Sequence, residues 1–139
     1  MAIVYDASSK TFNLSTSKTS YVLKVLDSNH VAHVYWGKKI KAKNLDYVLR
    51  SKNWGSFLTN TDNIDDFMLE MTPQEYPGYG STDLRTPAVE LQFSDGTSAT
   101  DFRYESHNIY AGKNKLNNLP ATYVEDENEA MTIELTVVD

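Results

Sequence analysis

The chain has 139 residues, of which 40% are hydrophobic and 23% are charged, values typical of one globular domain. It contains no cysteine, which excludes disulfides and thiolate metal sites. The net charge of −6 opposes binding to nucleic acids and to anionic membranes. No apolar run approaches the roughly 20 residues of a membrane-spanning helix, and the first ten residues lack a signal-peptide pattern, so we expect a cytoplasmic protein.

The composition favours β-structure. Aromatic residues make up 12% of the chain, and together with the frequent Val, Ile and Thr they suit the pleated surface of a sheet. Segment 20–27 is apolar on nearly both faces, with Tyr21, Leu23 and Val25 on one side, so we expect it at the centre of a sheet. Alternating segments separated by turn residues predict strands in the first part of the chain at 3–5, 11–15, 20–27 and 31–36.

The middle of the chain is less regular. After a basic run at 38–43, Leu45, Val48 and Leu49 recur at helical spacing and predict one short surface helix. Segment 50–66 is rich in Asn, Ser, Thr and Asp, which predicts a long loop. Long ordered loops on a rigid scaffold are where binding residues tend to lie.

The remainder is expected to return to strands. Glycine and proline residues exclude regular structure between 73 and 83, and Asp95-Gly96 predicts a hairpin turn. Because the sequence stops at Asp139, directly after the last strand, we expect the chain to be cut inside a larger β assembly, with exposed apolar surface on that strand. The predicted strands are 67–71, 87–93, 97 towards 110, 122–124, and 131–137, the last with Met131, Ile133, Leu135 and Val137 on one face.

The histidines do not predict a metal site. His30 and His33 are three positions apart, which places them on opposite faces of an extended strand, and no cysteine is present to join His107 in a ligand set. A phosphate-binding glycine loop is also missing from the sequence. We therefore expect no metal and no cofactor in this chain.

Carboxylates for glycoside hydrolysis are not predicted either. That reaction needs two facing carboxyl groups about 5 to 9 Å apart. The acidic runs at 65–66 and 125–127 are neighbours in turns, where they point into water. No Gly-x-Ser-x-Gly nucleophile motif occurs. The chain therefore offers no self-contained active site.

Segment 74–88 is unusually dense in aromatic, glycine, proline and charged residues. Aromatic rings beside Asp83 and Arg85 suit sugar recognition, because the C–H faces of a sugar stack on rings while charged groups bind its hydroxyls. The other interpretation is a rigid, self-packed loop in which Asp83 and Arg85 hold the backbone in place. Both interpretations remain open from the sequence.

An ordered series of motifs extends from this segment. Together the motifs resemble the N-terminal domain of bacterial α-galactosidases of glycoside hydrolase family 36, and the resemblance covers essentially the whole chain. The residues that carry it are His33-Val34-Tyr35-Trp36-Gly37-Lys38, Gln74-Glu75-Tyr76-Pro77, Gly80, Asp83, Arg85, Pro87, Ala88, Asp95-Gly96, Tyr104, His107, Ile109, Gly112-Lys113, Leu116, Leu119-Pro120-Ala121-Thr122-Tyr123-Val124 and Glu129-Ala130.

The resemblance implies an all-β fold, an antiparallel β-sandwich that forms part of a larger, galactose mutarotase-like β-supersandwich. In the family, this domain precedes a barrel whose two aspartates hydrolyse terminal α-galactosides, such as melibiose or raffinose, with retention. Residues 1–139 would then be the N-terminal domain, truncated before its own C-terminal half and before the barrel. No catalytic residue can be assigned here, Asp83 included, and we expect this fragment alone to be inactive.

The resemblance also implies partners and a binding role. Family members are commonly homotetramers in which a loop of this domain reaches the active-site mouth of a neighbouring subunit, and segment 53–57 is the matching stretch. We therefore take Trp54 and Phe57 as candidate substrate-binding residues that line the aglycone side for an α-galactoside oligosaccharide. The competing interpretation is that both aromatic side chains anchor the loop on its own sandwich.

Two other functions remain open at this stage. The chain could be a free-standing carbohydrate-binding module that uses its aromatic loops without hydrolysis, because fold alone does not determine function. A mutarotase-like enzyme of similar architecture would need a positioned acid and base, for which His33, His107 and a glutamate are the available groups.

The assignment of Trp54 and Phe57 can be tested in the completed enzyme. Replacing either residue with alanine should lower kcat/KM for longer galactosides more than for an aryl galactoside, because only the longer substrates extend beyond the scissile bond. Steady-state kinetics with both substrates measures the difference, and equal effects on the two would contradict an aglycone role.

Overall fold

The computed structural model describes residues 2–41, 44–49, 68–80, 83–114, 117–118, 120 and 128–138. This part of the chain consists of antiparallel strands and two single 3₁₀ turns, which confirms the predicted all-β class. Within it, no helix is long and apolar enough to cross a membrane. The strands are β1 (Ala2–Asp6), β2 (Thr11–Ser15), β3 (Thr19–Val25), β4 (Val31–Lys38), β5 (Asp101–Ala111) and β6 (Glu129–Val138).

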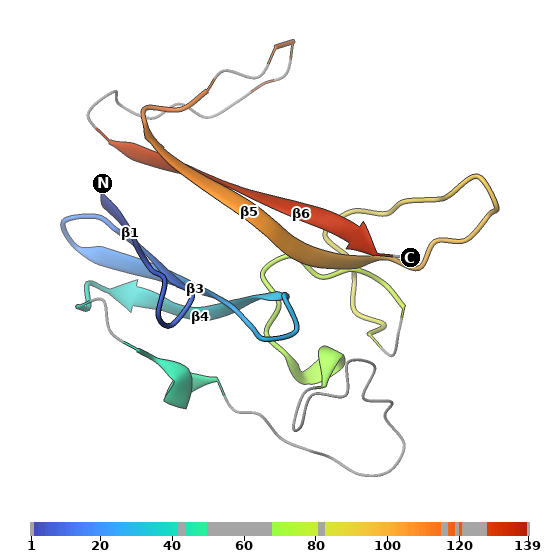
Figure 1. Cartoon of the computed structure of the whole chain (residues 1–139), viewed down its shortest axis with the longest axis horizontal. Coiled ribbons are helices and arrows are strands. Elements are labelled where there is room, and N and C mark those ends of the chain that lie inside the picture. The colour runs from blue at the N-terminus through green and yellow to red at the C-terminus, as the bar shows by residue number, and fades with distance from the viewer. Residues whose placement is uncertain are drawn as a thin grey trace.

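The first four strands form one sheet in the order β1-β2-β3-β4 (Figure 1). Strand β3 has a neighbour on each side, as predicted for segment 20–27. The tight connections use left-handed residues, with φ of 52° at Lys10 and 62° at Asn29. Asparagine tolerates the left-handed conformation well, which explains why Asn29 suits the turn between β3 and β4.

Strands β5 and β6 form a second sheet that lies across one face of the first (Figure 1). The core between the sheets is built from Phe12, Leu23, Val25 and Val31, and side chains of both sheets pack against it. The apolar face of β6 was expected to be exposed, and that prediction was wrong: the following side chains are partly buried and pack on this core, namely Met131, Ile133 and Leu135.

Two predicted strands are not strands in the structure. Residues Leu69–Met71 form a 3₁₀ turn, and 87–93 is a partly exposed arm that forms no ladder with the described residues. The turn at Asp95-Gly96 does form, with Gly96 at φ 89° and the Phe93 amide donating to the Thr97 carbonyl over 2.8 Å. Alternation alone did not make 87–93 a strand, because no neighbouring strand in the described part pairs with it.

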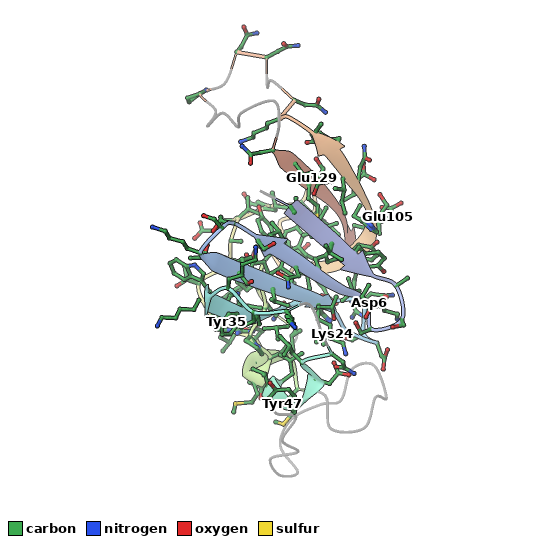
Figure 2. The ribbon with its side chains drawn as sticks, turned by 90° about the vertical axis from the view of Figure 1, so that its left-hand side faces the viewer. Asp6, Lys24, Tyr35, Tyr47, Glu105 and Glu129 are labelled. Carbon is green, nitrogen blue, oxygen red and sulfur yellow. The ribbon has the colours of Figure 1, made fainter. Side chains whose placement is uncertain are left out.

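The short helix expected near residues 45–49 is the 3₁₀ turn Asp46–Val48. Lys24 forms an ion pair with Asp46, which attaches this turn to β3. In Figure 2, Lys24 lies on the sheet beside the segment that carries Tyr47. The segment at 122–124 and the loop at 50–66 lie outside the described residues.

A buried polar network joins the two sheets. His30, in the turn between β3 and β4, is 1% exposed. Its Nδ1 pairs with the Ser28 hydroxyl over 2.9 Å, and its Nε2 pairs with Asp101 Oδ1 of β5 over 2.7 Å. Arg103 donates to Asp101 Oδ2 over 2.7 Å and to the Ser28 carbonyl over 2.8 Å. The Tyr104 amide donates to the Asn29 carbonyl over 2.7 Å, so the β3–β4 turn is fastened to β5.

This network predicts a loss of stability in acid. Burial alone would raise the pKa of Asp101, but hydrogen bonds from His30 and Arg103 outweigh it and hold the pKa below its usual 3.8. Since the folded pKa is the lower one, the stabilisation is present above pH 3.8 and is lost as the pH falls through the folded value. Urea unfolding should therefore show a steep fall in stability below about pH 4.

The matched variants separate this effect from general acid denaturation. Asp101→Asn should be less stable at pH 7 and should show a flatter decline in acid. Asp27→Asn removes a carboxylate whose side chain is 91% exposed and should leave the profile of the native chain nearly unchanged. If Asp101→Asn loses stability in acid as steeply as the native chain, Asp101 is not the group responsible for the acid dependence.

Candidate functional site

The segment 73–75 lies beside β4 and extends the first sheet. The His33 amide donates to the Pro73 carbonyl over 2.7 Å, and the Glu75 amide donates to the Val31 carbonyl over 2.8 Å. An isolated antiparallel bridge between Ala32 and Gln74 lies between these two bonds. This pairing fixes the position of the Glu75 side chain relative to β3 and β4.

The same segment is held by what we call the Asp83 clasp, made of Gln74, Asp83 and Arg85. Asp83 is 1% exposed, and its two carboxylate oxygens accept from the Arg85 guanidinium over 2.8 and 2.6 Å. The Gln74 amide donates to Asp83 Oδ2 over 2.6 Å. Arg85 also donates to the carbonyls of Thr72 and Leu69 over 2.7 and 2.9 Å. These contacts agree with the self-packed interpretation of segment 74–88.

The loop is also fastened just before β5. The Tyr79 amide donates to the Thr100 carbonyl over 3.1 Å, and the Thr100 amide donates back over 2.8 Å. A Cβ atom on Gly78 would lie 2.1 Å from the Thr100 carbonyl oxygen, so only glycine allows this approach. The loop therefore bridges β4 and the start of β5.

The clasped loop brings Glu75 against two ring side chains, forming the cluster Tyr21, His33 and Glu75, which we call the Tyr21 cluster. The Tyr21 hydroxyl donates to Glu75 Oε1, and His33 Nδ1 lies 3.4 Å from Glu75 Oε2. The ring centroids of Tyr21 and His33 are 5.1 Å apart. The side chains of His33 and Glu75 are 35% and 33% exposed, so the cluster reaches the surface.

The electrostatics of the Tyr21 cluster keep its hydroxyl protonated. Burial, followed by the hydrogen bond to Glu75 and the repulsion of its charge, raises the pKa of Tyr21 far above the usual 10. Tyr21 thus remains a hydrogen-bond donor at any physiological pH. The cluster offers a donor, a carboxylate and an imidazole, which can hold a polar ligand or relay a proton.

Glycoside hydrolysis needs more than this cluster contains, because two carboxyl groups must face each other. Within the described part of the chain, three of the carboxylates that are buried or partly buried are each paired with a basic side chain. Glu75 faces His33, Asp83 binds Arg85, and Asp101 binds His30 and Arg103. These acidic groups therefore serve to position the loop and the sheets.

The histidines are placed in three separate environments. His33 joins Glu75, whereas His107 Nδ1 pairs with the Tyr104 hydroxyl over 2.7 Å and its ring packs on Tyr5 and Phe12. The two residues considered for a mutarotase-like acid and base thus have different partners. Among the residues that the structure describes, no group of three or more His, Asp or Glu side chains is arranged to hold a metal ion.

Trp54 and Phe57, the predicted substrate-binding residues, lie outside the described residues. Sequence reasoning did not single out the contact between Tyr21 and Glu75. The two residues are 54 positions apart, and Tyr21 was interpreted only as part of a central strand. The one available signal was the Gln74-Glu75-Tyr76-Pro77 motif, which marked Glu75 but not its partner.

Residues 29–139 match the model of the glycosyl hydrolase family 36 N-terminal domain, a range that includes the Asp83 clasp and both His33 and Glu75. The chain belongs to this family. It is 43% identical to α-galactosidase AgaA of Geobacillus stearothermophilus over 144 residues, covering 100% of this chain and 19% of AgaA. Thus this family 36 N-terminal domain spans about a fifth of the length of that curated relative.

Solved structures agree with the family assignment. The crystal structure of the family 36 α-galactosidase AgaB from Geobacillus stearothermophilus is 43% identical with a TM-score of 0.82, covering 97% of this chain and 18% of AgaB. A variant of AgaA from the same organism, in complex with raffinose, is 44% identical with a TM-score of 0.77, covering 94% of this chain and 18% of AgaA. The resemblance inferred from the sequence is thereby confirmed.

The Asp83 clasp makes a prediction for stability. Replacing Arg85 with methionine leaves the Asp83 carboxylate buried without its guanidinium partner, and should lower the free energy of unfolding by about 3 kcal/mol. Urea unfolding of the purified chain measures this. Lys38→Met is the matched control, because it removes a cation from the exposed end of β4, and it should change stability by less than about 0.5 kcal/mol. Equal effects of the two substitutions would contradict the role of the clasp.

Proposed function

We propose that this chain is the N-terminal, non-catalytic part of an α-galactosidase that hydrolyses terminal α-galactosides. The observation that carries the proposal is the family match over residues 29–139, together with full-chain similarity to a curated α-galactosidase about five times as long. The pairing of Glu75, Asp83 and Asp101 with basic side chains supports it, because these carboxylates are committed to holding the domain together.

The chemistry, in this proposal, belongs to a barrel domain outside the 139 residues. Two aspartates there act as nucleophile and as acid/base in a retaining mechanism, for which the two carboxyl groups stand about 5 Å apart. The sandwich described here forms part of a larger β-supersandwich, and its contribution is to support the barrel and its neighbouring subunits in a homotetramer.

The proposed substrates are galactosides of the melibiose and raffinose type. Support comes from the solved relative that holds raffinose and is 44% identical to this chain. Trp54 and Phe57 remain our candidates for the aglycone side of the pocket in a neighbouring subunit.

Activity assays test the proposal directly. A full-length enzyme in which these 139 residues are the N-terminal part should release nitrophenol from p-nitrophenyl α-galactoside but not from the β-anomer. The purified 139-residue chain alone should give no release above the uncatalysed rate, since in this proposal the two facing carboxyl groups belong to the barrel.

Two outcomes would contradict the proposal. Turnover by the 139-residue chain alone would place catalytic groups within it. Sugar binding by the chain, combined with a stop codon directly after the codon for Asp139, would instead indicate a free-standing carbohydrate-binding module.

A further inference from the structure

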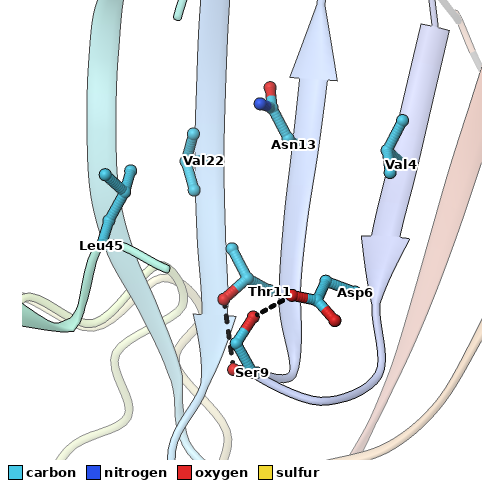
Figure 3. Close-up of a pocket in the computed structure, with 7 residues that line it drawn as sticks. All are labelled: Val4, Asp6, Ser9, Thr11, Asn13, Val22 and Leu45. Carbon is cyan, nitrogen blue, oxygen red and sulfur yellow. Dashed lines mark hydrogen bonds between the residues drawn. The ribbon is translucent and has the colours of Figure 1, made fainter. Parts of the chain in front are cut away.

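The outer face of the first sheet carries a hollow of about 210 Å³, which we call the outer-face hollow (Figure 3). It lies on the side of the sheet opposite to β5 and β6. Strand pairing aligns Val4 with Asn13 and Asn13 with Val22, so one row of side chains crosses β1, β2 and β3. The residues that line the hollow are Val4, Asp6, Ser9, Thr11, Asn13, Val22 and Leu45.

Asn13 has an unsatisfied acceptor in this hollow. The residue is 5% exposed, and within the described part of the chain its side-chain oxygen has no hydrogen-bond partner. Figure 3 shows its amide standing between the side chains of Val4 and Val22. A buried oxygen without a partner destabilises the folded state, so a ligand that donates a hydrogen bond to it would stabilise the chain.

The hydroxyl groups of Ser9 and Thr11 in the hollow already donate hydrogen bonds to other protein atoms. Thr11 donates to the Ser9 carbonyl over 3.1 Å, and the Ser9 hydroxyl donates to Asp6 Oδ2 over 2.9 Å. Both dashed lines are visible in Figure 3. The oxygens of Asp6, Ser9, Thr11 and Asn13 therefore remain available as acceptors, which suits a ligand that carries hydrogen-bond donors, while the Asn13 amide nitrogen is itself a donor.

Neutral hydroxyl donors fit this arrangement better than an ammonium group. The one carboxylate, Asp6, is exposed at the rim, where it already accepts hydrogen bonds from Ser8 and Ser9. The deep position holds the uncharged Asn13 between apolar side chains, and a cation buried there would lack a counter-charge. A hydroxyl group satisfies the Asn13 oxygen without that penalty.

The apolar residues of the hollow indicate what the non-polar part of the ligand is. Val22 is 1% exposed and forms the floor beside Asn13, while Leu45 approaches from the segment that the Lys24–Asp46 ion pair fastens to β3. These side chains suit the C–H face of a carbon skeleton. Pockets that hold drug-sized ligands measure roughly 300–1,000 Å³, so this smaller hollow suits a smaller molecule.

We infer that the outer-face hollow is a binding site for a single neutral sugar ring or a polyol of similar size. Asn13 accepts a hydrogen bond from one hydroxyl, Thr11 and Asp6 accept from others, and the ring carbons pack on Val4, Val22 and Leu45. The site is formed by this chain alone and does not depend on the α-galactosidase function proposed above.

Titration of the ¹⁵N-labelled 139-residue chain with galactose, followed by NMR, tests this inference. Saturable shifts are expected at the side-chain amide of Asn13 and at the backbone amides of Val4 and Val22. Propylamine, a small primary ammonium ion, should produce no saturable shift at these positions. Saturation by propylamine but not by galactose, or by neither, would overturn the proposal.

Variants give the decisive readout. Asn13→Leu should weaken galactose binding at least about tenfold, through loss of one hydrogen bond, and should raise the urea midpoint because an unpaired acceptor is removed. Asn108→Leu, the same change on β5, should leave the affinity unchanged. A lower midpoint in Asn13→Leu with unchanged affinity would show that Asn13 is purely structural and would overturn the proposal.

A second variant covers the case in which Asn13→Leu does not fold. Val4 is 51% exposed, so Val4→Ser is expected to preserve the sheet. It should weaken galactose binding a few-fold, by removing apolar contact with the ring carbons. Unchanged galactose binding in Val4→Ser would show that the ring carbons do not pack on Val4 and would overturn the proposal.

Discussion

The alignment of the two sheets depends on the buried interaction of His30 with Asp101. His30 lies in a turn of the first sheet and is almost completely buried, while its carboxylate partner begins the first strand of the second sheet. A buried imidazole or carboxylate is costly unless it is hydrogen-bonded, so neither group is satisfied until the sheets are correctly stacked. Buried polar pairs of this kind add little stability compared with apolar packing, but removing one partner leaves the other buried and unpaired, which is strongly destabilising. The network therefore selects one alignment of the sandwich.

The sequence predicted most of the regular structure, because alternation and turn residues are local signals. Strands β1 to β4 and β6 are found where the patterns placed them, and the turn at Asp95-Gly96 forms as expected. Segment 87–93 has the same alternation and is not a strand. A strand exists only with a partner, and the partner is decided by distant parts of the chain.

The polar interior was much harder to anticipate. Asp83 and Arg85 are two positions apart, and their pairing was one of the interpretations that the sequence left open. His30 and Asp101 are 71 positions apart, and no local pattern indicates that they meet. Asn13 occupies an ordinary alternating strand, and that its side-chain oxygen has no hydrogen-bond partner among the described residues becomes evident only when the outer face is assembled. Periodicity in the sequence predicts the elements, but it does not show which side chains of different elements meet.

The partly exposed arm at 87–93 has a thermodynamic consequence for pairing with another chain. Its side chains already alternate in the strand sense, yet its backbone forms no ladder with the described residues. If an extended segment docked alongside the arm, the arm would gain main-chain hydrogen bonds by β-augmentation. Its side chains would keep the faces that they already have. The cost would be the conformational entropy of the arm's backbone, about 1–2 kcal/mol for each residue that becomes fixed. The free energy needed to fix the backbone of the arm would therefore have to come from the chain that pairs with it.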